Sequence, residues 1–190
     1  MIAAVLAGGR ARRFGGDKLL YRIDGKPLIA HVIERLLRAS EIKEVVVVAS
    51  PDRVEPMREL GVDVIPDDLL VGPMGGVYTA LSLGDVFVVA GDMPSVVPEL
   101  VDDMVRTFRR SGKVACVPLW PNGYIEPLHS VYSSRLRPAI EERLERRDYS
   151  LNSLIRSVDA CYVRIDGLPE EWRDSFFNVN TKRDLESWTK

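Results

Sequence analysis

The sequence alternates short continuous apolar runs with segments whose apolar residues recur at the helix period. Residues 2–7 (IAAVLA) and 44–50 (EVVVVAS) are typical of strands covered on both faces. Between them, residues 27–39 place their apolar side chains on one helical face, with Pro27 suited to the first turn. Strands separated by helices need right-handed crossovers and a mostly parallel sheet. We therefore expect an α/β fold, a Rossmann-like doubly wound sheet with helices on both faces.

The rest of the chain continues this order up to about residue 120 and then becomes less regular. Further strands are expected at 62–66, 86–92, 114–119 and 161–165, strand and turn at 124–132, and a loop at 67–76. Helices are expected at 51–60, 77–83, 98–111, 133–148 and 181–190, with Pro138 interrupting the helix at 133–148. No repeat or long linker divides the 190 residues, so residues 1–190 are expected to form one domain. Within it, residues 1–119 would form the regularly alternating part and residues 120–190 an accessory C-terminal part.

The composition excludes several classes of function. The formal net charge is −2, without the basic excess that nucleic acid binding requires. The longest apolar runs are too short to span a bilayer, and no secretory signal is evident at the N-terminus, so no membrane partner is expected. Cys116 and Cys161 lack the spacing of a metal site and are expected to be two buried thiols of a cytoplasmic protein.

The segment LAGGRARRFGGDK, residues 6–18, follows the first expected strand. In an open parallel sheet this position lies at the carboxyl end of a strand, where ligands bind. Its glycines allow close approach of a ligand to backbone N–H groups. Arg10, Arg12, Arg13 and Lys18 supply the positive charge that phosphates require. The combination favours an anion site over a solvated surface turn.

Neither common phosphate-loop pattern describes this segment. The glycines are spaced GG-x5-GG, which does not match the dinucleotide fingerprint, and Asp17 and Leu19 flank Lys18 where a P-loop has glycine and a hydroxyl. A second signal is Asp92, which follows the apolar run 86–90 after Gly91. A carboxylate facing a phosphate loop is a natural ligand for Mg²⁺, although an Asp that begins a turn before Pro94 is also common.

Several motifs together resemble the molybdenum cofactor guanylyltransferase family. They are LAGGRARRFGGDKLL, GKPLIAHV, GPMGG, VVAGDMP and FFNVNTKRDL, and they follow the family order from residue 6 to 185. The first motif and Asp92 are shared with the wider nucleotidyltransferase superfamily, whereas GPMGG and FFNVNT are more specific. The resemblance implies a single domain of the nucleotide-diphospho-sugar transferase type, in which residues 1–119 would bind a nucleotide and residues 120–190 would form the acceptor-binding and C-terminal part.

The resemblance also implies an activity, in which GMP passes from GTP to molybdopterin cofactor and pyrophosphate is released with Mg²⁺. The residues that the resemblance assigns are Leu6, Ala7, Gly8, Gly9, Gly15, Lys18, Ser50, Asp67, Gly75, Gly76 and Asp92 for the nucleotide, Lys18, Arg13 and Asp92 for catalysis, Asp92 for the metal, and Asn178, Asn180 and His129 for the acceptor. Ser50 stands where the family often has asparagine, which leaves the guanine preference open. Molybdoenzymes or cofactor-insertion proteins are possible further partners.

Three assignments have structural alternatives. Asn180 could instead cap the terminal helix, with Phe176 and Phe177 anchoring the segment. His129 could be a packed core histidine, and residues 120–124 (WPNGY) a plain hairpin rather than part of the acceptor pocket. No nucleophile constellation is present, which agrees with transfer between phosphates that needs no strong protein base.

Other functions are compatible with parts of this pattern. The same chemistry could use CTP, or another phosphorylated acceptor such as a cobamide precursor, a sugar phosphate or a phospholactate. A nucleotide-binding protein that delivers cofactor without turnover is a further alternative, but binding alone would not require both Lys18 and Asp92. A dinucleotide-binding oxidoreductase does not fit the glycine spacing.

Overall fold

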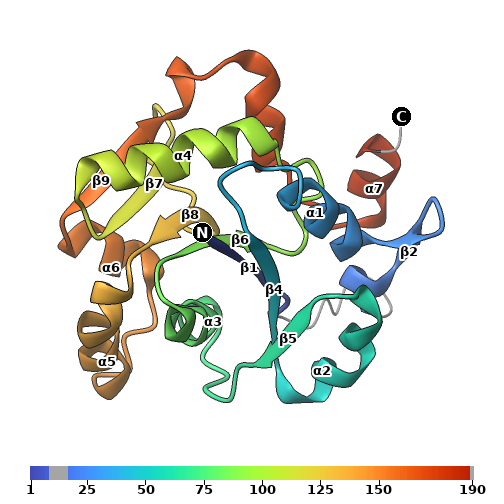
Figure 1. Ribbon diagram of the computed structural model, residues 1–190, viewed down its shortest axis with the longest axis horizontal. Helices are drawn as coiled ribbons and strands as arrows, with labels where there is room; N and C mark the ends of the chain where they lie inside the picture. Colours follow the sequence, from blue (N-terminus) through green and yellow to red (C-terminus); the bar gives the residue numbers. More distant parts are fainter. Residues whose placement is uncertain (9–16, 189–190) are drawn as a thin grey trace.

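A computed structural model describes residues 1–8 and 17–188 and shows a seven-stranded sheet between two layers of helices (Figure 1). The sheet has the order β5-β4-β1-β6-β8-β7-β9. Its strands are β1 (Ile2–Leu6), β4 (Glu44–Ala49), β5 (Asp63–Pro66), β6 (Val86–Ala90), β7 (Ala115–Leu119), β8 (His129–Tyr132) and β9 (Ala160–Arg164). All neighbours pair in parallel except β8, which is antiparallel to β6 and β7. The expected mostly parallel α/β sheet is confirmed.

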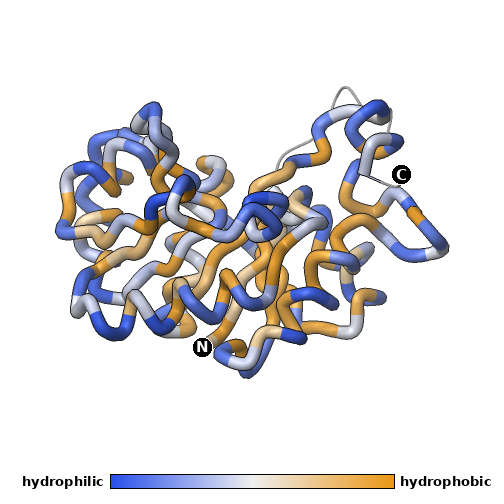
Figure 2. The backbone as a smooth tube through the Cα atoms, turned by 90° about the horizontal axis from the view of Figure 1, so that it is seen from above, coloured by the Kyte–Doolittle hydropathy of each residue, from blue (hydrophilic) through white to orange (hydrophobic). Residues whose placement is uncertain are grey.

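Helices cover both faces of the sheet because successive strand residues point to opposite sides. Val45 and Val47 of β4 belong to one core cluster, whereas Val46 and Val48 belong to the other. The first cluster packs under α1 (Leu28–Leu36), α2 (Pro51–Met57) and α4 (Pro98–Ser111), and the second under α3 (Pro73–Ala80), α5 (Arg137–Glu145) and α6 (Leu151–Ser157). In Figure 2 the hydrophobic segments run through the interior and the hydrophilic ones follow the outer turns.

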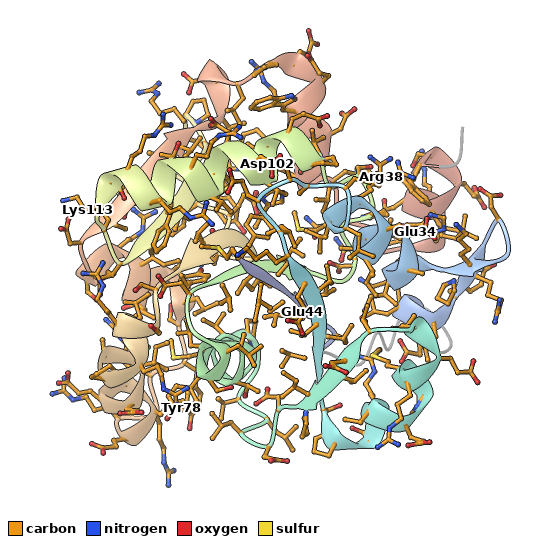
Figure 3. All side chains as sticks on the ribbon, in the orientation of Figure 1. Glu34, Arg38, Glu44, Tyr78, Asp102 and Lys113 are labelled. Atoms are coloured by element: carbon orange, nitrogen blue, oxygen red, sulfur yellow. The ribbon has the colours of Figure 1, made fainter. Side chains whose placement is uncertain are left out.

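The connections between layers are held by side chains as well as by the core. A short hairpin of β2 (Arg22–Ile23) and β3 (Lys26–Pro27) precedes α1, and α7 (Lys182–Trp188) returns to it, where Trp188 meets the ring of His31 edge-on. Asp102 of α4, labelled in Figure 3, accepts hydrogen bonds from the backbone N–H groups of Ser40 and Glu41. This contact fixes the connection between α1 and β4.

Three expectations about local structure were wrong. The helix α3 begins at Pro73, so most of GPMGG lies in its first turns rather than in a loop. Pro138 does not interrupt α5, because it occupies the first turn, where no intrahelical N–H bond is lost. The helix α6 was not expected, although Ser150 caps it by accepting a hydrogen bond from the N–H of Ser153.

The two cysteines lie opposite each other on the adjacent strands β7 and β9. Both are free, and Cys116 is buried, as expected, whereas Cys161 is partly exposed. Burial raises the pKa of the Cys116 thiol. In residues 1–8 and 17–188, no helix has the length and apolar character needed to cross a membrane.

Candidate active site

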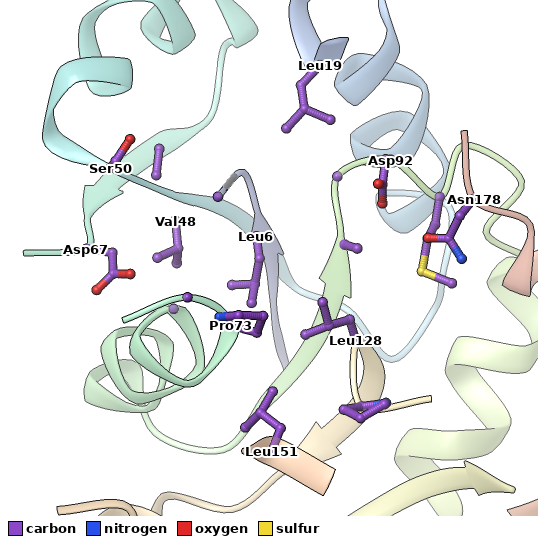
Figure 4. A pocket seen from close by; sticks show the side chains of 18 of the residues that line it. Leu6, Leu19, Val48, Ser50, Asp67, Pro73, Asp92, Leu128, Leu151 and Asn178 are labelled. Atoms are coloured by element: carbon purple, nitrogen blue, oxygen red, sulfur yellow. The ribbon is translucent and has the colours of Figure 1, made fainter. Parts of the chain in front are cut away.

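A cavity of about 890 Å³ opens at the carboxyl ends of the parallel strands. The chain runs from β1 outward through β4 and β5 and then returns to place β6 on the other side of β1. Such a switch point leaves a crevice beyond the strand ends, and this is where open α/β sheets bind ligands. In Figure 4, Ser50 and Asp67 lie on one side of Leu6, Asp92 and Asn178 on the other, and Leu128 and Leu151 below.

Lys18 and Asp92 form an ion pair at the wall of this cavity. Lys18 Nζ lies 2.7 Å from Asp92 Oδ2, and the two side chains are only 11% and 21% exposed. Lys18 belongs to a short 3₁₀ turn, Lys18–Leu20, while Asp92 follows β6 after Gly91. A Cβ at Gly91 would come within 3.2 Å of Leu19 Cδ1, so the glycine lets the two segments approach. The structure thus brings together the predicted cation and carboxylate.

Arg53 of α2 connects both ends of the glycine-rich loop, and the sequence analysis did not identify it. Its guanidinium donates to the carbonyl oxygen of Ala7 and to both carboxylate oxygens of Asp17. Ala7 is buried and takes part through its backbone, whereas Gly8 lines the cavity. Gly9, Arg13 and Gly15 lie outside the described residues. An arginine beside Pro51 at a helix start carries no specific sequence signal, so only the fold indicates this role.

Asp67 and Gly76 line the cavity, whereas Gly75 is buried against Asp67 and does not itself line it. Asp67 is 9% exposed, and its Oδ1 accepts hydrogen bonds from the Leu69 N–H and the Thr79 hydroxyl. A Cβ at Gly75 would lie 2.9 Å from Asp67 Oδ2, and one at Gly76 would lie 3.1 Å from Leu6 Cδ1. The two glycines therefore allow α3 to approach Asp67 and β1 closely. Both Gly76 and Asp67 line the cavity.

Ser50 directly follows β4 and precedes the first residue of α2. It lines the cavity, and its side chain makes no capping hydrogen bond to that helix. Its hydroxyl is therefore not used to cap α2, which leaves it available to a ligand. The predicted nucleotide residues Leu6, Gly8, Ser50, Asp67 and Gly76 all line one wall of the same cavity.

The C-terminal segment with the two asparagines is attached to the loop that carries Asp92. The Val179 N–H donates to the Asp92 carbonyl oxygen at 2.9 Å, and Phe176 packs against Trp120 and His129. Asn178 lines the cavity, while Lys18 Nζ lies 3.5 Å from Asn180 Oδ1. The expected anchoring by the phenylalanines is confirmed.

The capping alternative for Asn180 was wrong, because Thr181 caps α7 instead. The Thr181 hydroxyl accepts a hydrogen bond from the Asp184 N–H at 3.2 Å. In return, Asp184 Oδ2 accepts bonds from the N–H groups of Thr181 and Asn180. The Asn180 side chain is therefore turned toward Lys18 rather than toward the helix.

His129 does not reach the cavity, so direct contact with an acceptor does not fit this geometry. It is fully buried on β8, with Nε2 2.7 Å from the Ser175 hydroxyl oxygen and its ring edge-on to Phe87. Nδ1 has no hydrogen-bond partner within the described chain. Burial lowers the pKa of His129 to about 4, because the imidazolium would lose its hydration. The alternative of a packed core histidine is the one that the structure supports.

The cavity is also lined by four residues of which the sequence singled out only Tyr124, in the 120–124 segment. Tyr124 and Glu126 approach it from the 120–126 turn, and Tyr149 and Asn152 from the start of α6. The turn is the tight hairpin expected from WPNGY, in which the Trp120 N–H donates to the Tyr124 carbonyl oxygen and Leu119 pairs with Ile125. Tyr149 belongs to no motif, and only the fold brings it here.

Comparisons with known proteins agree with this arrangement. The family model described as "MobA-like NTP transferase domain" matches residues 3–161. A Thermococcus gammatolerans protein named probable molybdenum cofactor guanylyltransferase is 63% identical over 97% of each chain, and an Aquifex aeolicus protein of that name is 39% identical over 95% of this chain and 86% of its own. The crystal structure of molybdopterin-guanine dinucleotide biosynthesis protein A from Archaeoglobus fulgidus superposes with a TM-score of 0.86, at 28% identity and covering 98% and 96% of the two chains. The chain belongs to the MobA-like NTP transferase family.

Proposed function

We propose that this protein transfers GMP from GTP to the molybdopterin cofactor and releases pyrophosphate. The observation that carries the proposal is the Lys18–Asp92 ion pair in a cavity large enough for two substrates. The names of the relatives, which are molybdenum cofactor guanylyltransferases at up to 63% identity, support the same reaction. The protein is proposed to act in the cytoplasm, where it would hand its product to molybdoenzymes or to cofactor-insertion proteins.

In this reaction the terminal phosphate of the acceptor attacks the α-phosphorus of GTP. A new phosphorus–oxygen bond forms, the bond from the α-phosphorus to the bridging oxygen breaks, and pyrophosphate leaves with that electron pair. The nucleophile is already an anion, so the protein must chiefly position two anionic groups and offset their repulsion. Lys18 meets this need, since its ammonium group pairs at 2.7 Å with the Asp92 carboxylate, which an incoming phosphate can replace.

Asp92 is the residue that would hold Mg²⁺. Within residues 1–8 and 17–188, no three His, Cys, Asp or Glu side chains cluster as a complete metal site. A single carboxylate fits Mg²⁺ nonetheless, because this ion commonly takes one or two protein carboxylates and completes its shell with water and phosphate oxygens. When bound, it would neutralise phosphate charge, and Lys18 would leave Asp92 for the phosphates.

The nucleotide is proposed to lie along Leu6 and Gly8, with its base toward Ser50 and Asp67. Oδ2 of Asp67 faces Gly75, and this carboxylate can accept bonds from the amino and ring N–H groups of guanine. Arg13 and the glycines 9 and 15 are proposed to contact the phosphates, with Asn178 and Asn180 toward the acceptor. Guanine selection remains the part of the proposal that needs measurement.

Mass spectrometry of the products tests the proposal. Purified protein, Mg²⁺ and molybdopterin cofactor are incubated separately with GTP, CTP, ATP and UTP, and pyrophosphate is measured in parallel. We expect a guanylylated pterin from GTP alone, and a cytidylylated product would move the base assignment while keeping the chemistry. Absence of product from folded protein that binds GTP would favour another acceptor or a delivery protein.

Lys18→Ala serves as the matched loss-of-function variant in this assay. We expect turnover to fall by about tenfold to a thousandfold, the range for one lost electrostatic contact at a reacting phosphate. Lys26→Ala is the control, because Lys26 also forms an ion pair, with Glu34, but on the exposed β2–β3 hairpin. Equal activity of both variants would remove Lys18 from the reaction.

A further inference from the structure

Two exposed aromatic side chains line the cavity. Tyr124 is 53% exposed and Tyr149 is 41% exposed, and both line the cavity, unlike the similarly exposed Tyr162 on β9. They come from segments far apart in the chain. Arg156 of α6 joins these segments by donating to the Gly123 carbonyl oxygen at 2.6 Å. Exposed aromatic rings that line a cavity present apolar surface to water, and a planar ligand that covers them removes this surface from water with a gain in free energy.

Glu126 lies in the same part of the cavity and is held in a fixed orientation. Its backbone N–H donates to the Pro118 carbonyl oxygen, and its Oε1 accepts a 2.6 Å hydrogen bond from the Trp120 indole. Trp120 in turn packs edge-on against Phe176. Oε2 of Glu126 makes no hydrogen bond within the described residues. Burial raises the pKa of Glu126, which means that its carboxylate is poorly solvated and would gain from ligand donors.

A carboxylate that lines a cavity together with two exposed aromatic side chains suits one kind of ligand. A planar heterocycle with an amino group beside a ring N–H presents two donors in one plane, and a carboxylate accepts both. Resting on the proposed function, we propose that Glu126 recognises this donor edge on the pterin ring of the acceptor, with Tyr124 and Tyr149 covering the ring faces. Asp92 and Lys18 then lie between this pocket and the nucleotide side.

Guanine carries the same donor edge, so the pocket must be assigned to one substrate. Ser50 and Asp67 already form a polar group on the opposite side of Leu6 (Figure 4). In the sheet order, β6, which leads to Asp92, lies between β1 and β8, and Glu126 precedes β8 by three residues, so Glu126 lies on the other side of Asp92 from Ser50 and Asp67. We therefore assign Glu126 to the acceptor, and weakened GTP binding in its variants would reverse this assignment.

The test compares inhibition of the transfer reaction by neopterin monophosphate and by its lumazine counterpart, in which an oxygen replaces the 2-amino group. We expect wild type to prefer the pterin by about tenfold to a hundredfold, the range for a hydrogen bond to a charged group. In Glu126→Gln the preference should collapse, because the amide can donate to the lumazine oxygen. The KM for molybdopterin should rise by a similar factor while kcat and the Kd for GTP stay near wild type.

Matched controls separate this inference from the proposed function. Glu145→Gln changes an exposed glutamate on α5, and Tyr162→Ala an exposed tyrosine outside the cavity, so neither should alter KM for molybdopterin. Tyr124→Ala should raise it by about tenfold. Transfer to molybdopterin without pterin preference in wild type, or with the preference intact in Glu126→Gln, overturns the Glu126 pocket and leaves the proposed function standing. No transfer from any nucleotide would instead contradict the function.

Discussion

The two ends of the cavity are built in different ways. The nucleotide end uses backbone, glycines and charges that lie in short contiguous motifs at the ends of β1, β5 and β6. The pterin end uses the side chains of Tyr124, Glu126 and Tyr149, which two separate turns bring together. The first arrangement suits phosphates, which every nucleotide shares. The second suits the shape and hydrogen-bonding edge of one particular ring.

Because the two ends are built differently, we expect mutations at each end to change different kinetic constants. Changes at the phosphate site should reduce turnover for every acceptor, because the reacting groups are held there. Changes at the pterin end should raise KM and alter which ring is accepted, while the chemical step is kept. Variants at the phosphate site, in the core and at the nucleotide end test whether turnover, stability and substrate affinity can be changed separately.

The largest effect is expected from Asp92→Asn. Removing the carboxylate charge should lower kcat by about a thousandfold and weaken the dependence on Mg²⁺, because phosphate charge is then no longer neutralised. Initial rates over a range of Mg²⁺ concentrations measure this. Asp85→Asn is the control, since Asp85 precedes β6, at the opposite end of that strand from Asp92, and accepts hydrogen bonds from Ser133 and Ser134. Unchanged metal dependence in Asp92→Asn would contradict its role.

The next effect concerns the core behind the pterin end. The pKa of His129 is lowered to about 4 in the folded protein, whereas a histidine in the unfolded chain binds a proton near pH 6.5. Between these pH values, protonation therefore favours the unfolded state. Stability should therefore fall as the pH decreases from about 6.5 to 4, by about 3 kcal/mol in total.

Urea unfolding between pH 7 and pH 4 checks this, with His129→Gln as the comparison. Glutamine can keep a hydrogen bond to Ser175 but does not titrate. We expect a flatter dependence of the free energy of unfolding on pH in the variant. Parallel curves for the two proteins would mean that other groups determine acid stability.

A smaller effect is expected from Gly75→Ala at the nucleotide end. The added Cβ would lie 2.9 Å from Asp67 Oδ2 and displace that carboxylate. We expect the Kd for GTP to rise by about tenfold with kcat nearly unchanged, since the phosphate site is not touched. Titration calorimetry with a non-hydrolysable GTP analogue measures the Kd.

Gly167→Ala provides the matched control for this substitution. A Cβ there meets nothing within 4 Å, and the residue lies in a surface turn far from the cavity residues. Its GTP affinity should equal that of wild type. A loss of affinity shared by both variants would indicate a general loss of stability rather than the Asp67 contact.

The sequence was most informative where local chemistry determines structure. The buried valines of β4 and the heptad-like face of α4 predicted their elements, and the motif residues Lys18, Asp67 and Asp92 proved to lie around one cavity. The predictions at α3 and α5 were wrong because proline and glycine were interpreted as signs of a loop or a break. Both residues are also compatible with the first turn of a helix, where they occur in these two elements.

The remainder depends on tertiary contacts that no local pattern encodes. Arg53 acquires its role only because α2 faces both ends of the glycine loop, and Tyr149 only because α6 packs beside the 120–124 turn. The resemblance assigned His129 to the acceptor, yet its position on β8 buries it away from the cavity. Register decides which face a side chain takes, and a motif does not state it.

The central claim is that both substrates occupy this cavity together and react directly at Lys18 and Asp92. The most direct test uses one diastereomer of GTP with sulfur at the α-phosphorus and determines the configuration of the thio-dinucleotide product. Direct in-line transfer predicts inversion at phosphorus, together with initial-rate lines that intersect. Retention of configuration, with parallel lines, would show a covalent nucleotidyl-enzyme and contradict a single two-substrate site.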